Sequence, residues 1–350
     1  METDITYDVC IVGGGLSGLS LSILLAKNKI KVICLEKEQY PFHRVCGEYI
    51  SMESWPFLKN LGLELDSMEL PRINKLQVSA PSGKLLHANL DLGGFGISRY
   101  KLDLELCTLA KSEGVTVLEN SKVSDICFKD GVFSTILKNT TIFSKIAIAT
   151  IGKRSNLDIK WERQFIKQKQ SKLNNYIGVK YHIETSFPAD TIALHNFKNG
   201  YCGVSKIEDN KFCLCYLTTA KNLKQSNNSI IKMEETILSK NPHIKKLLTT
   251  SKKLFEEPVT ISQISFDKKE LFVDHIIMSG DAAGMITPLC GNGMSIAFRS
   301  AHLLSPLLIK YLSGSITRQQ LETIYKRKWD KAFSFRLKTG QFIQIGRAHV

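Results

Sequence analysis

Residues 7–36, YDVCIVGGGLSGLSLSILLAKNKIKVICLE, decide the fold. A short β-rich run (7–12) leads directly into a glycine-rich turn, and an apolar run that is compatible with a helix (19–27) follows. A second strand-like run (31–35) ends in Glu36. A strand, a turn, a helix and a second strand within about 30 residues make a βαβ unit. We therefore predict an α/β fold that opens with a Rossmann-type domain.

The glycines of the turn have the spacing G-x-G-x-x-G. Gly13 permits the tight turn, Gly15 leaves room for a pyrophosphate to approach the backbone, and Gly18 lets the helix pack closely on the strand. The N-terminus of the helix, with Leu16 and Ser17, offers free N–H groups and a partial positive charge to the phosphates. The sequence therefore predicts that this unit binds a dinucleotide.

Glu36 stands at the end of the second strand of the unit. A carboxylate at this position accepts hydrogen bonds from the hydroxyl groups of the adenosine ribose, and it disfavours a 2′-phosphate. FAD or NAD therefore suits the site better than NADP. We place Glu36 and the next residue, Lys37, among the residues expected to bind the cofactor.

A second motif, far along the chain, favours FAD over NAD. A strand predicted at Ile276–Met278 leads into S-G-D-A-A, and a G-N-G-M turn then opens an apolar helical run (295–309). These residues resemble the G-D-A…P…G-x-G segment of FAD-dependent oxidoreductases with the para-hydroxybenzoate hydroxylase fold. The resemblance implies that Asp281 binds the ribityl chain and that the turn brings N–H groups to the pyrimidine edge of the flavin. The cofactor-binding residues expected from this motif are Gly280, Asp281, Pro288, Gly291, Asn292, Gly293 and Met294.

Two shorter matches agree with this family. Arg99 opens an R-x-x-x-D-x-x-L stretch, in which the family places the arginine near the cofactor. Gly152 and Ser155 match the family pattern A-x-G-x-x-S, whereas Ile151 replaces the usual aspartate. That replacement weakens any expectation that position 151 contacts NADPH or FAD.

Residues 40–51, YPFHRVCGEYIS, resemble the P-x-x-x-x-C-G-E/G stretch of the geranylgeranyl reductase-like branch of this superfamily. The resemblance implies that Arg44, Cys46 and Gly47 lie by the cofactor, with Cys46 and Gly47 next to the isoalloxazine ring. Cys46 is either a redox thiol, activated by the positive charge of Arg44 and His43, or simply a small residue that lets the flavin approach. Glu48 is either a proton donor or a carboxylate at the start of a helix. We take Cys46 and Glu48 as the catalytic candidates.

Four strand-like runs (176–183, 191–196, 201–207 and 211–218) form the middle of the chain and predict an antiparallel substrate sheet over the flavin. His182 and His195 lie on these strands, where a structural role is more common than a catalytic one. The W-x-W-x-x-P signature of flavin halogenases is absent, and the aromatic signature of the reductases is not intact. We predict a discontinuous FAD-binding domain (1–70, 96–156 and 272–350) and a substrate domain (71–95 and 157–271).

The amino-acid composition narrows the binding partners and the cellular compartment that we expect for the protein. The net charge is +14, but the lysines are dispersed and lack interleaved aromatics, so we expect no nucleic acid. A peripheral contact with a membrane surface stays open. The 9 cysteines form no C-x-x-C pair, which predicts no metal site and no disulfide framework. We expect a cytoplasmic protein, because the N-terminus lacks the basic segment of a secretory signal.

These expectations define an FAD-dependent oxidoreductase that transfers a hydride through flavin N5, with an apolar or unsaturated compound as the expected substrate of a reductase. NADH or NADPH would serve as a transient electron donor, since no second G-x-G-x-x-G unit is present. The first alternative is an aromatic monooxygenase, which would take a small aromatic substrate. The second is an electron-transfer flavoprotein without a substrate of its own. The sequence does not determine the oligomeric state.

Overall fold

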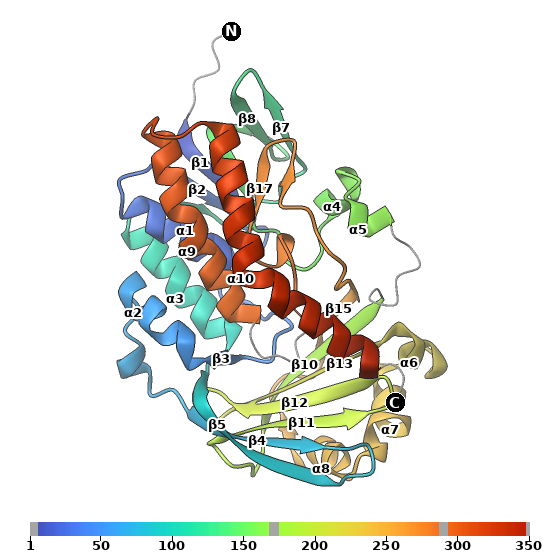
Figure 1. Cartoon of the computed structure of the whole chain (residues 1–350). Coiled ribbons are helices and arrows are strands. Elements are labelled where there is room, and N and C mark those ends of the chain that lie inside the picture. Colours follow the sequence, from blue (N-terminus) through green and yellow to red (C-terminus); the bar gives the residue numbers. More distant parts are fainter. Residues whose placement is uncertain (1–5, 168–174, 287–292, 348–350) are drawn as a thin grey trace.

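The computed structural model describes residues 6–167, 175–286 and 293–347, the last seven by their backbone alone (Figure 1). These residues form two sheets, one at each end of the view in Figure 1. Both the α/β class and the Rossmann-type opening unit are confirmed.

The first sheet is built around the predicted βαβ unit. β1 (Tyr7–Val12) lies between β2 (Val32–Leu35) and β9 (Thr141–Ala149), and the three strands run parallel. β17 (Ile276–Met278) continues the parallel sheet beside β9, and β6 (Thr116–Leu118) continues it beside β2. The turn after β1 and the turn after β17 therefore leave the sheet at the same edge, the edge where such folds bind ligands.

Antiparallel strands complete the first sheet, and helices cover it. The antiparallel strands are β7 (Asp125–Lys129), β8 (Val132–Ile136) and β16 (Phe272–Val273). α1 (Leu16–Ala26) packs against α3 (Arg99–Ser112) and α9 (Gly293–Leu312), and α10 (Arg318–Arg347) packs on α9 (Figure 1). On α10, Tyr325, Trp329 and Phe333 repeat at a spacing of four residues and are all buried.

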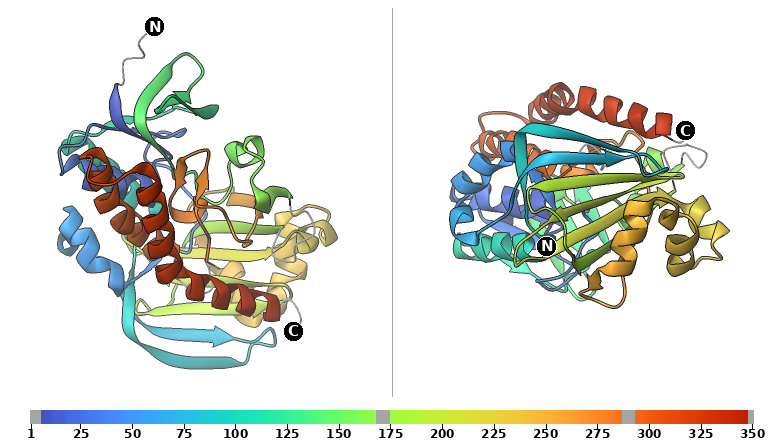
Figure 2. Two further views of the ribbon diagram at one scale, coloured as in Figure 1. Left: turned by 45° about the horizontal axis from the view of Figure 1, so that its top comes forward. Right: turned by 90° about the horizontal axis from the view of Figure 1, so that it is seen from below.

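The second sheet has the order β14-β10-β13-β12-β11-β4-β5-β3, with β15 also paired to β10. Its strands are β3 (Tyr49–Ser51), β4 (Arg72–Ser79), β5 (Leu85–Gly96), β10 (Tyr176–Glu184), β11 (Thr191–Phe197), β12 (Gly200–Lys206), β13 (Phe212–Thr219), β14 (Lys252–Lys253) and β15 (Val259–Ile264). The neighbouring pairs are antiparallel except β4 with β11. Figure 2 shows this sheet from below, with the long β4–β5 hairpin along one side.

The remaining helices are short. α2 (Trp55–Leu61) follows β3, α4 (Asn156–Lys160) and α5 (Gln164–Lys167) follow β9, and α6 (Ala220–Gln225), α7 (Ile230–Thr236) and α8 (Pro242–Thr250) follow β13. Side chains of α7 and α8 pack on one face of the second sheet.

Strand alternation gives the second sheet two different faces. On β10, Val179 and Tyr181 join the apolar core beneath α7 and α8. Gly178 and Lys180 point the opposite way, and a Cβ at Gly178 would come within 2.8 Å of the Val45 side chain. The sheet thus turns this second face toward the segment that follows β2.

Among the residues that the structure describes, no helix is both long enough and apolar enough to cross a membrane.

Candidate functional site

The glycine-rich turn has the geometry that its spacing predicts. Gly13 has a φ of +109°, and a Cβ there would lie 2.4 Å from the carbonyl oxygen of Thr150. A Cβ at Gly18 would lie 2.1 Å from the carbonyl oxygen of Gly13. A Cβ at Gly15, in contrast, would have only Arg99 Nη2 nearby, at 3.8 Å. Gly13 and Gly18 are therefore required by packing, whereas Gly15 keeps an open approach to the backbone.

The N-terminus of α1 has free donors. Its N-cap is Gly15, which has no side chain to accept from the first N–H groups of the helix. Leu16 is buried, and Ser17 points its hydroxyl into a cluster described below. Unpaired N–H groups at a helix start attract a phosphate.

Glu36 is buried beside this turn. Its Oε2 accepts hydrogen bonds from Gly14 N at 2.9 Å and from Arg44 Nη2 at 2.8 Å, and its Oε1 accepts from Glu38 N at 3.1 Å. A carboxylate has about four acceptor positions. The described residues thus occupy three of them, and one is left for a ligand hydroxyl. Lys37 is exposed and pairs with Glu38 at 3.3 Å.

The turn after β17 meets the start of α1. Ser279 Oγ lies 2.8 Å from Ser17 Oγ, and Ser300 Oγ of α9 lies 3.2 Å from Ser17 Oγ. Gly280 has a φ of +65°, and a Cβ there would come within 2.9 Å of Ser17. The two motifs, far apart in sequence, therefore touch.

The rest of the second motif is described only in part. Asp281 is half-buried directly after Gly280. Gly293 opens α9, with open space where a Cβ would be, and Met294 is buried behind it. Pro288, Gly291 and Asn292 lie outside the described residues.

Arg99 connects the two turns to the segment after β2. It begins α3, and its Nε and Nη2 donate to Asp103 at 2.7 and 2.8 Å. Its charge acts on both Cys46 and Asp281, and the Asp103 carboxylate outweighs the effect of burial and raises the pKa of Arg99. A half-buried, permanently charged guanidinium therefore lies near the Gly15 turn and interacts with Cys46 and Asp281, which are predicted on the flavin side of the cofactor.

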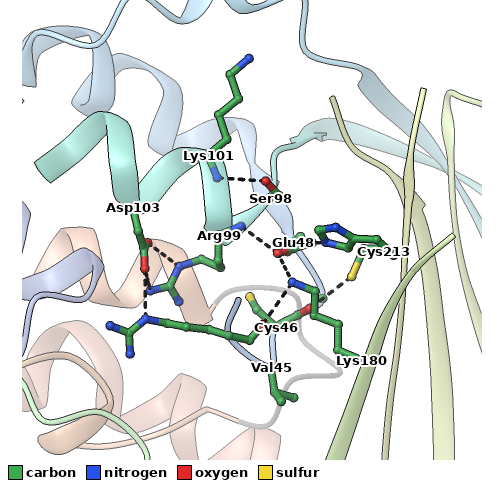
Figure 3. A network of polar contacts seen from close by, with 12 residues as sticks. Val45, Cys46, Glu48, Ser98, Arg99, Lys101, Asp103, Lys180 and Cys213 are labelled. Atoms are coloured by element: carbon green, nitrogen blue, oxygen red, sulfur yellow. Dashed lines mark hydrogen bonds and ion pairs between the residues drawn. The ribbon is translucent and has the colours of Figure 1, made fainter. Parts of the chain in front are cut away.

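The segment 44–47 is held by its carbonyl oxygens (Figure 3). Each of the four oxygens accepts from a different side chain. Lys180 Nζ donates to Arg44 O at 3.2 Å, Lys153 Nζ to Val45 O at 2.9 Å, Cys213 Sγ to Cys46 O at 3.2 Å and Ser205 Oγ to Gly47 O at 3.4 Å. Three donors from the second sheet and one from the loop after β9 thus hold the backbone on which Cys46 and Gly47 lie.

Glu48 is the centre of a buried ionic network (Figure 3). Its Oε1 accepts from Arg99 N at 2.7 Å and from Lys180 Nζ, and its Oε2 lies 2.6 Å from His182 Nε2. Burial alone would raise the pKa of Glu48, but Lys180 and His182 outweigh it and lower that pKa to about 2. The side chain is therefore an ionised carboxylate. The backbone N–H that donates to it belongs to Arg99, the first residue of α3.

The charges around Cys46 differ from the expectation that Arg44 and His43 supply them. Arg44 is engaged with Glu36 and with Asp103, the latter at 3.1 Å. Burial and the nearby Lys180 charge lower the pKa of His43 to about 4, so His43 is neutral at pH 7. Cys46 is among the groups that raise the pKa values of Lys180 and Arg99, after the larger effects of Glu48 and Asp103. Cys46 itself is half-buried.

The two strand histidines have different surroundings. His182 belongs to the Glu48 network. His195 lies on the opposite face of the second sheet, the face that packs against α8. Its Nδ1 is 2.9 Å from Ser79 Oγ, and its ring stacks on that of His243 with the centroids 5.1 Å apart. Within the described residues, no group of three or more His, Cys, Asp or Glu side chains is arranged to hold a metal ion.

Three lysines of this region were missed by sequence reasoning: Lys153, Lys180 and Lys269. On β10, Lys180 alternates with Gly178 and His182. This alternation is the one sequence signal that could have placed Lys180 on the sheet face that lies toward the segment after β2. No local pattern marks the other two, because their partners are backbone oxygens of distant loops.

The low pKa of Glu48 predicts how the stability of the fold depends on pH. The folded-state pKa of about 2 lies below the ordinary value of 4.5. The contribution of the Glu48 carboxylate to the unfolding free energy is therefore fully present above about pH 4.5. This contribution is lost as the pH falls from 4.5 toward 2. The unfolding free energy, measured with urea, should change less between pH 6 and pH 3 in Glu48→Gln than in the wild type. Equal differences would contradict this assignment.

The described residues fit FAD. Positions Gly15, Gly47, Gly152 and Gly293 have open space where a Cβ would be, apart from Arg99 Nη2 near Gly15. A free helix start, a carboxylate with an open acceptor position and the turn that carries Asp281 lie along the same edge of the first sheet.

The comparisons with known proteins agree with this geometry. Residues 6–129 match the family model described as FAD binding domain. The chain is 24% identical to conditioned medium factor receptor 1 of Dictyostelium discoideum over 93% of the chain and 68% of that protein. It is 23% identical to digeranylgeranylglycerophospholipid reductase of Methanococcus vannielii, over 94% of the chain and 84% of that protein. It is 24% identical to kynurenine 3-monooxygenase of Christiangramia forsetii, over 93% and 75%.

Solved structures share the fold. A geranylgeranyl bacteriochlorophyll reductase-like protein from Thermoplasma acidophilum has a TM-score of 0.81 at 18% identity, over 98% of this chain and 88% of that one. The flavin-dependent halogenase CmlS has a TM-score of 0.80 at 19% identity, over 95% of this chain. The chain spans 63% of the length of CmlS.

These findings confirm the resemblance to the para-hydroxybenzoate hydroxylase fold and its geranylgeranyl reductase-like branch. Residues 6–129 form an FAD-binding domain, and the proteins to which the chain is similar include reductases, a monooxygenase and halogenases. The individual site residues and the domain boundaries stay predictions.

Proposed function

We propose that the chain binds one FAD along the edge where the two turns meet and acts as a reductase of an apolar or unsaturated substrate. The single observation that supports this most is the contact between the two motifs, where Ser279 Oγ lies 2.8 Å from Ser17 Oγ. That contact supports a single continuous site for the residues predicted to bind the phosphates and those predicted to bind the flavin. When bound, FAD would supply two-electron redox chemistry.

Each residue then has a role that its contacts support. The start of α1 binds the pyrophosphate, and the open acceptor position of Glu36 takes a ribose hydroxyl. Asp281 holds the ribityl chain. Gly47 leaves space for the isoalloxazine ring, because no described atom lies within 4 Å of a Cβ there.

The substrate side of the site is apolar. Residues of the second sheet form a cluster with Met285, which follows the turn at Gly280. The buried members are Tyr176, Tyr201, Leu217, Ile264, Phe266 and Met285. Because this apolar cluster is buried next to the turn at Gly280, it supports an apolar substrate in preference to a charged one. Two of the similar proteins, digeranylgeranylglycerophospholipid reductase and kynurenine 3-monooxygenase, support an apolar chain and an aromatic compound, respectively, as the substrate class.

The ionised state of Glu48 narrows its role. A carboxylate with a pKa of about 2 carries no proton to give at neutral pH. We therefore assign Glu48 to holding Lys180, His182 and the start of α3. Cys46 is the catalytic candidate that keeps access to the site, since its side chain is half-buried.

An anaerobic titration tests the proposal. The FAD-loaded chain should lose the visible absorbance of oxidised flavin on addition of NADH or NADPH. A prenylated lipid should then restore the colour without oxygen. If colour returns only with oxygen, and an aromatic substrate gains an oxygen atom from labelled O₂, the protein is a monooxygenase. A chain that neither nucleotide reduces would support an electron-transfer role with another donor.

A further inference from the structure

Two lysines link three loops, and two of these loops carry predicted flavin contacts. Lys269 Nζ donates to the carbonyl oxygen of Asp281 at 2.9 Å and to that of Lys153 at 3.0 Å. Lys153 Nζ in turn donates to the carbonyl oxygen of Val45 at 2.9 Å. We call Lys153 and Lys269 the lysine relay. The loops that it joins contain Asp281, Gly152 and the Cys46–Gly47 pair.

The relay differs from the third lysine of the region in its charge balance. Lys180 has Glu48 as a direct carboxylate partner. Neither Lys153 nor Lys269 forms an ion pair with any described side chain within 4.0 Å, and both use their ammonium groups on backbone oxygens. Asp158, the carboxylate with the strongest pull on Lys269, is itself paired with Arg163 at 2.8 Å. Among the described residues, the relay therefore carries positive charge without a direct carboxylate partner, although Asp158, Asp281 and Glu270 act on Lys269 from further away.

Burial makes this charge costly. Lys269 is only 4% exposed, and its ammonium lies 4.7 Å from the Phe165 ring. Burial lowers the pKa of Lys269 to about 8, although Asp158 and Asp281 oppose that shift. A buried ammonium without a carboxylate partner is stabilised when negative charge develops nearby.

We propose that Lys153 and Lys269 are positioning residues that raise the reduction potential of the bound flavin. The inference rests on the proposed FAD site. Reduction adds negative charge to the cofactor, and cations close to the ring stabilise that charge. The relay also neutralises the partial negative charge of the carbonyl oxygens at Val45, Lys153 and Asp281, which would otherwise oppose reduction.

The midpoint potential of the FAD-loaded full chain tests this directly. The potential is read by equilibration with a redox dye at pH 7, for the wild type and for Lys269→Met and Lys153→Met. We expect each variant to lower the reduced-to-oxidised ratio at a fixed dye potential by about tenfold, which is about 30 mV for a two-electron couple. Lys153→Arg, which keeps the charge, should stay close to the wild type.

Lys268→Met is the matched control, because it removes the same charge one residue away from an exposed side chain. It should leave the midpoint potential unchanged. If Lys269→Met does not fold, Lys153→Met decides, because Lys153 is only half-buried.

The outcomes separate the two proposals. FAD-loaded variants with the wild-type midpoint potential would overturn the role of the relay and leave the FAD site in place. An equal shift in Lys268→Met would also overturn it, because the effect would then follow from overall charge. A wild-type chain that retains no FAD would overturn the proposed function and the role of the relay with it.

Discussion

Gly15→Val should abolish FAD binding without unfolding the chain. The extra side chain would enter the space in front of the α1 N-terminus, where the pyrophosphate is proposed to lie. Because only Arg99 Nη2 comes near that position, at 3.8 Å, the substitution meets little of the protein itself. We expect the affinity for FAD to fall on the order of 100-fold or more, a loss of about 2.7 kcal/mol. Titration of the apo chain with FAD, followed by flavin fluorescence, measures it.

Gly18→Ala provides the contrast. A Cβ at Gly18 would lie 2.1 Å from the carbonyl oxygen of Gly13, so this variant should lower the melting temperature of the apo chain. Gly15→Val should melt like the wild type. If Gly15→Val bound FAD normally, the pyrophosphate would have to lie elsewhere. If both variants melted alike, the distinction drawn between the two glycines would be wrong.

Lys180→Met should cause the largest loss of stability. The substitution leaves the Glu48 carboxylate buried with His182 and a backbone N–H but without its ammonium partner. Breaking one side of a buried ion pair costs about 3–5 kcal/mol. Urea unfolding at pH 7, followed by circular dichroism, should show a fall in the unfolding free energy of that size.

A double variant and a surface control make the second prediction specific. Glu48→Gln combined with Lys180→Met should recover part of the loss, because no unpaired charge is then buried. Lys252→Met, which breaks an exposed pair with Glu184 on the neighbouring strand, should cost less than about 1 kcal/mol. A Lys180→Met variant as stable as Lys252→Met would contradict the network.

The sequence predicted the parts of the site that depend on local geometry. The spacing of Gly13, Gly15 and Gly18 requires a particular turn, and the structure has that turn with the predicted close contacts. The residue alternation of the middle strands predicted β10 to β13 with bounds close to those observed. Glu36 comes directly after β2, and β2 lies next to β1 in the βαβ unit. The hydrogen bond from Gly14 N to Glu36 is therefore a consequence of that unit alone.

Long-range ionic partners could not be predicted in this way. Glu48 and Lys180 are 132 residues apart, and no local spacing relates them. Arg44 pairs with both Glu36 and Asp103 of α3, and no local spacing in the sequence indicates either partner. Carbonyl acceptors, such as those of Val45 and Asp281, have no signature in a sequence because every residue has one.

We propose that FAD lies at the edge of the first sheet where the turn after β1 meets the turn after β17. The most direct test is to incubate the purified full chain with excess FAD, remove the free cofactor by gel filtration and record the absorbance spectrum. We predict close to one FAD per chain in the wild type, and much less in Asp281→Ala and Gly15→Val, with all three chains folded. A folded wild-type chain that elutes colourless, or variants that retain as much flavin as the wild type, would contradict it.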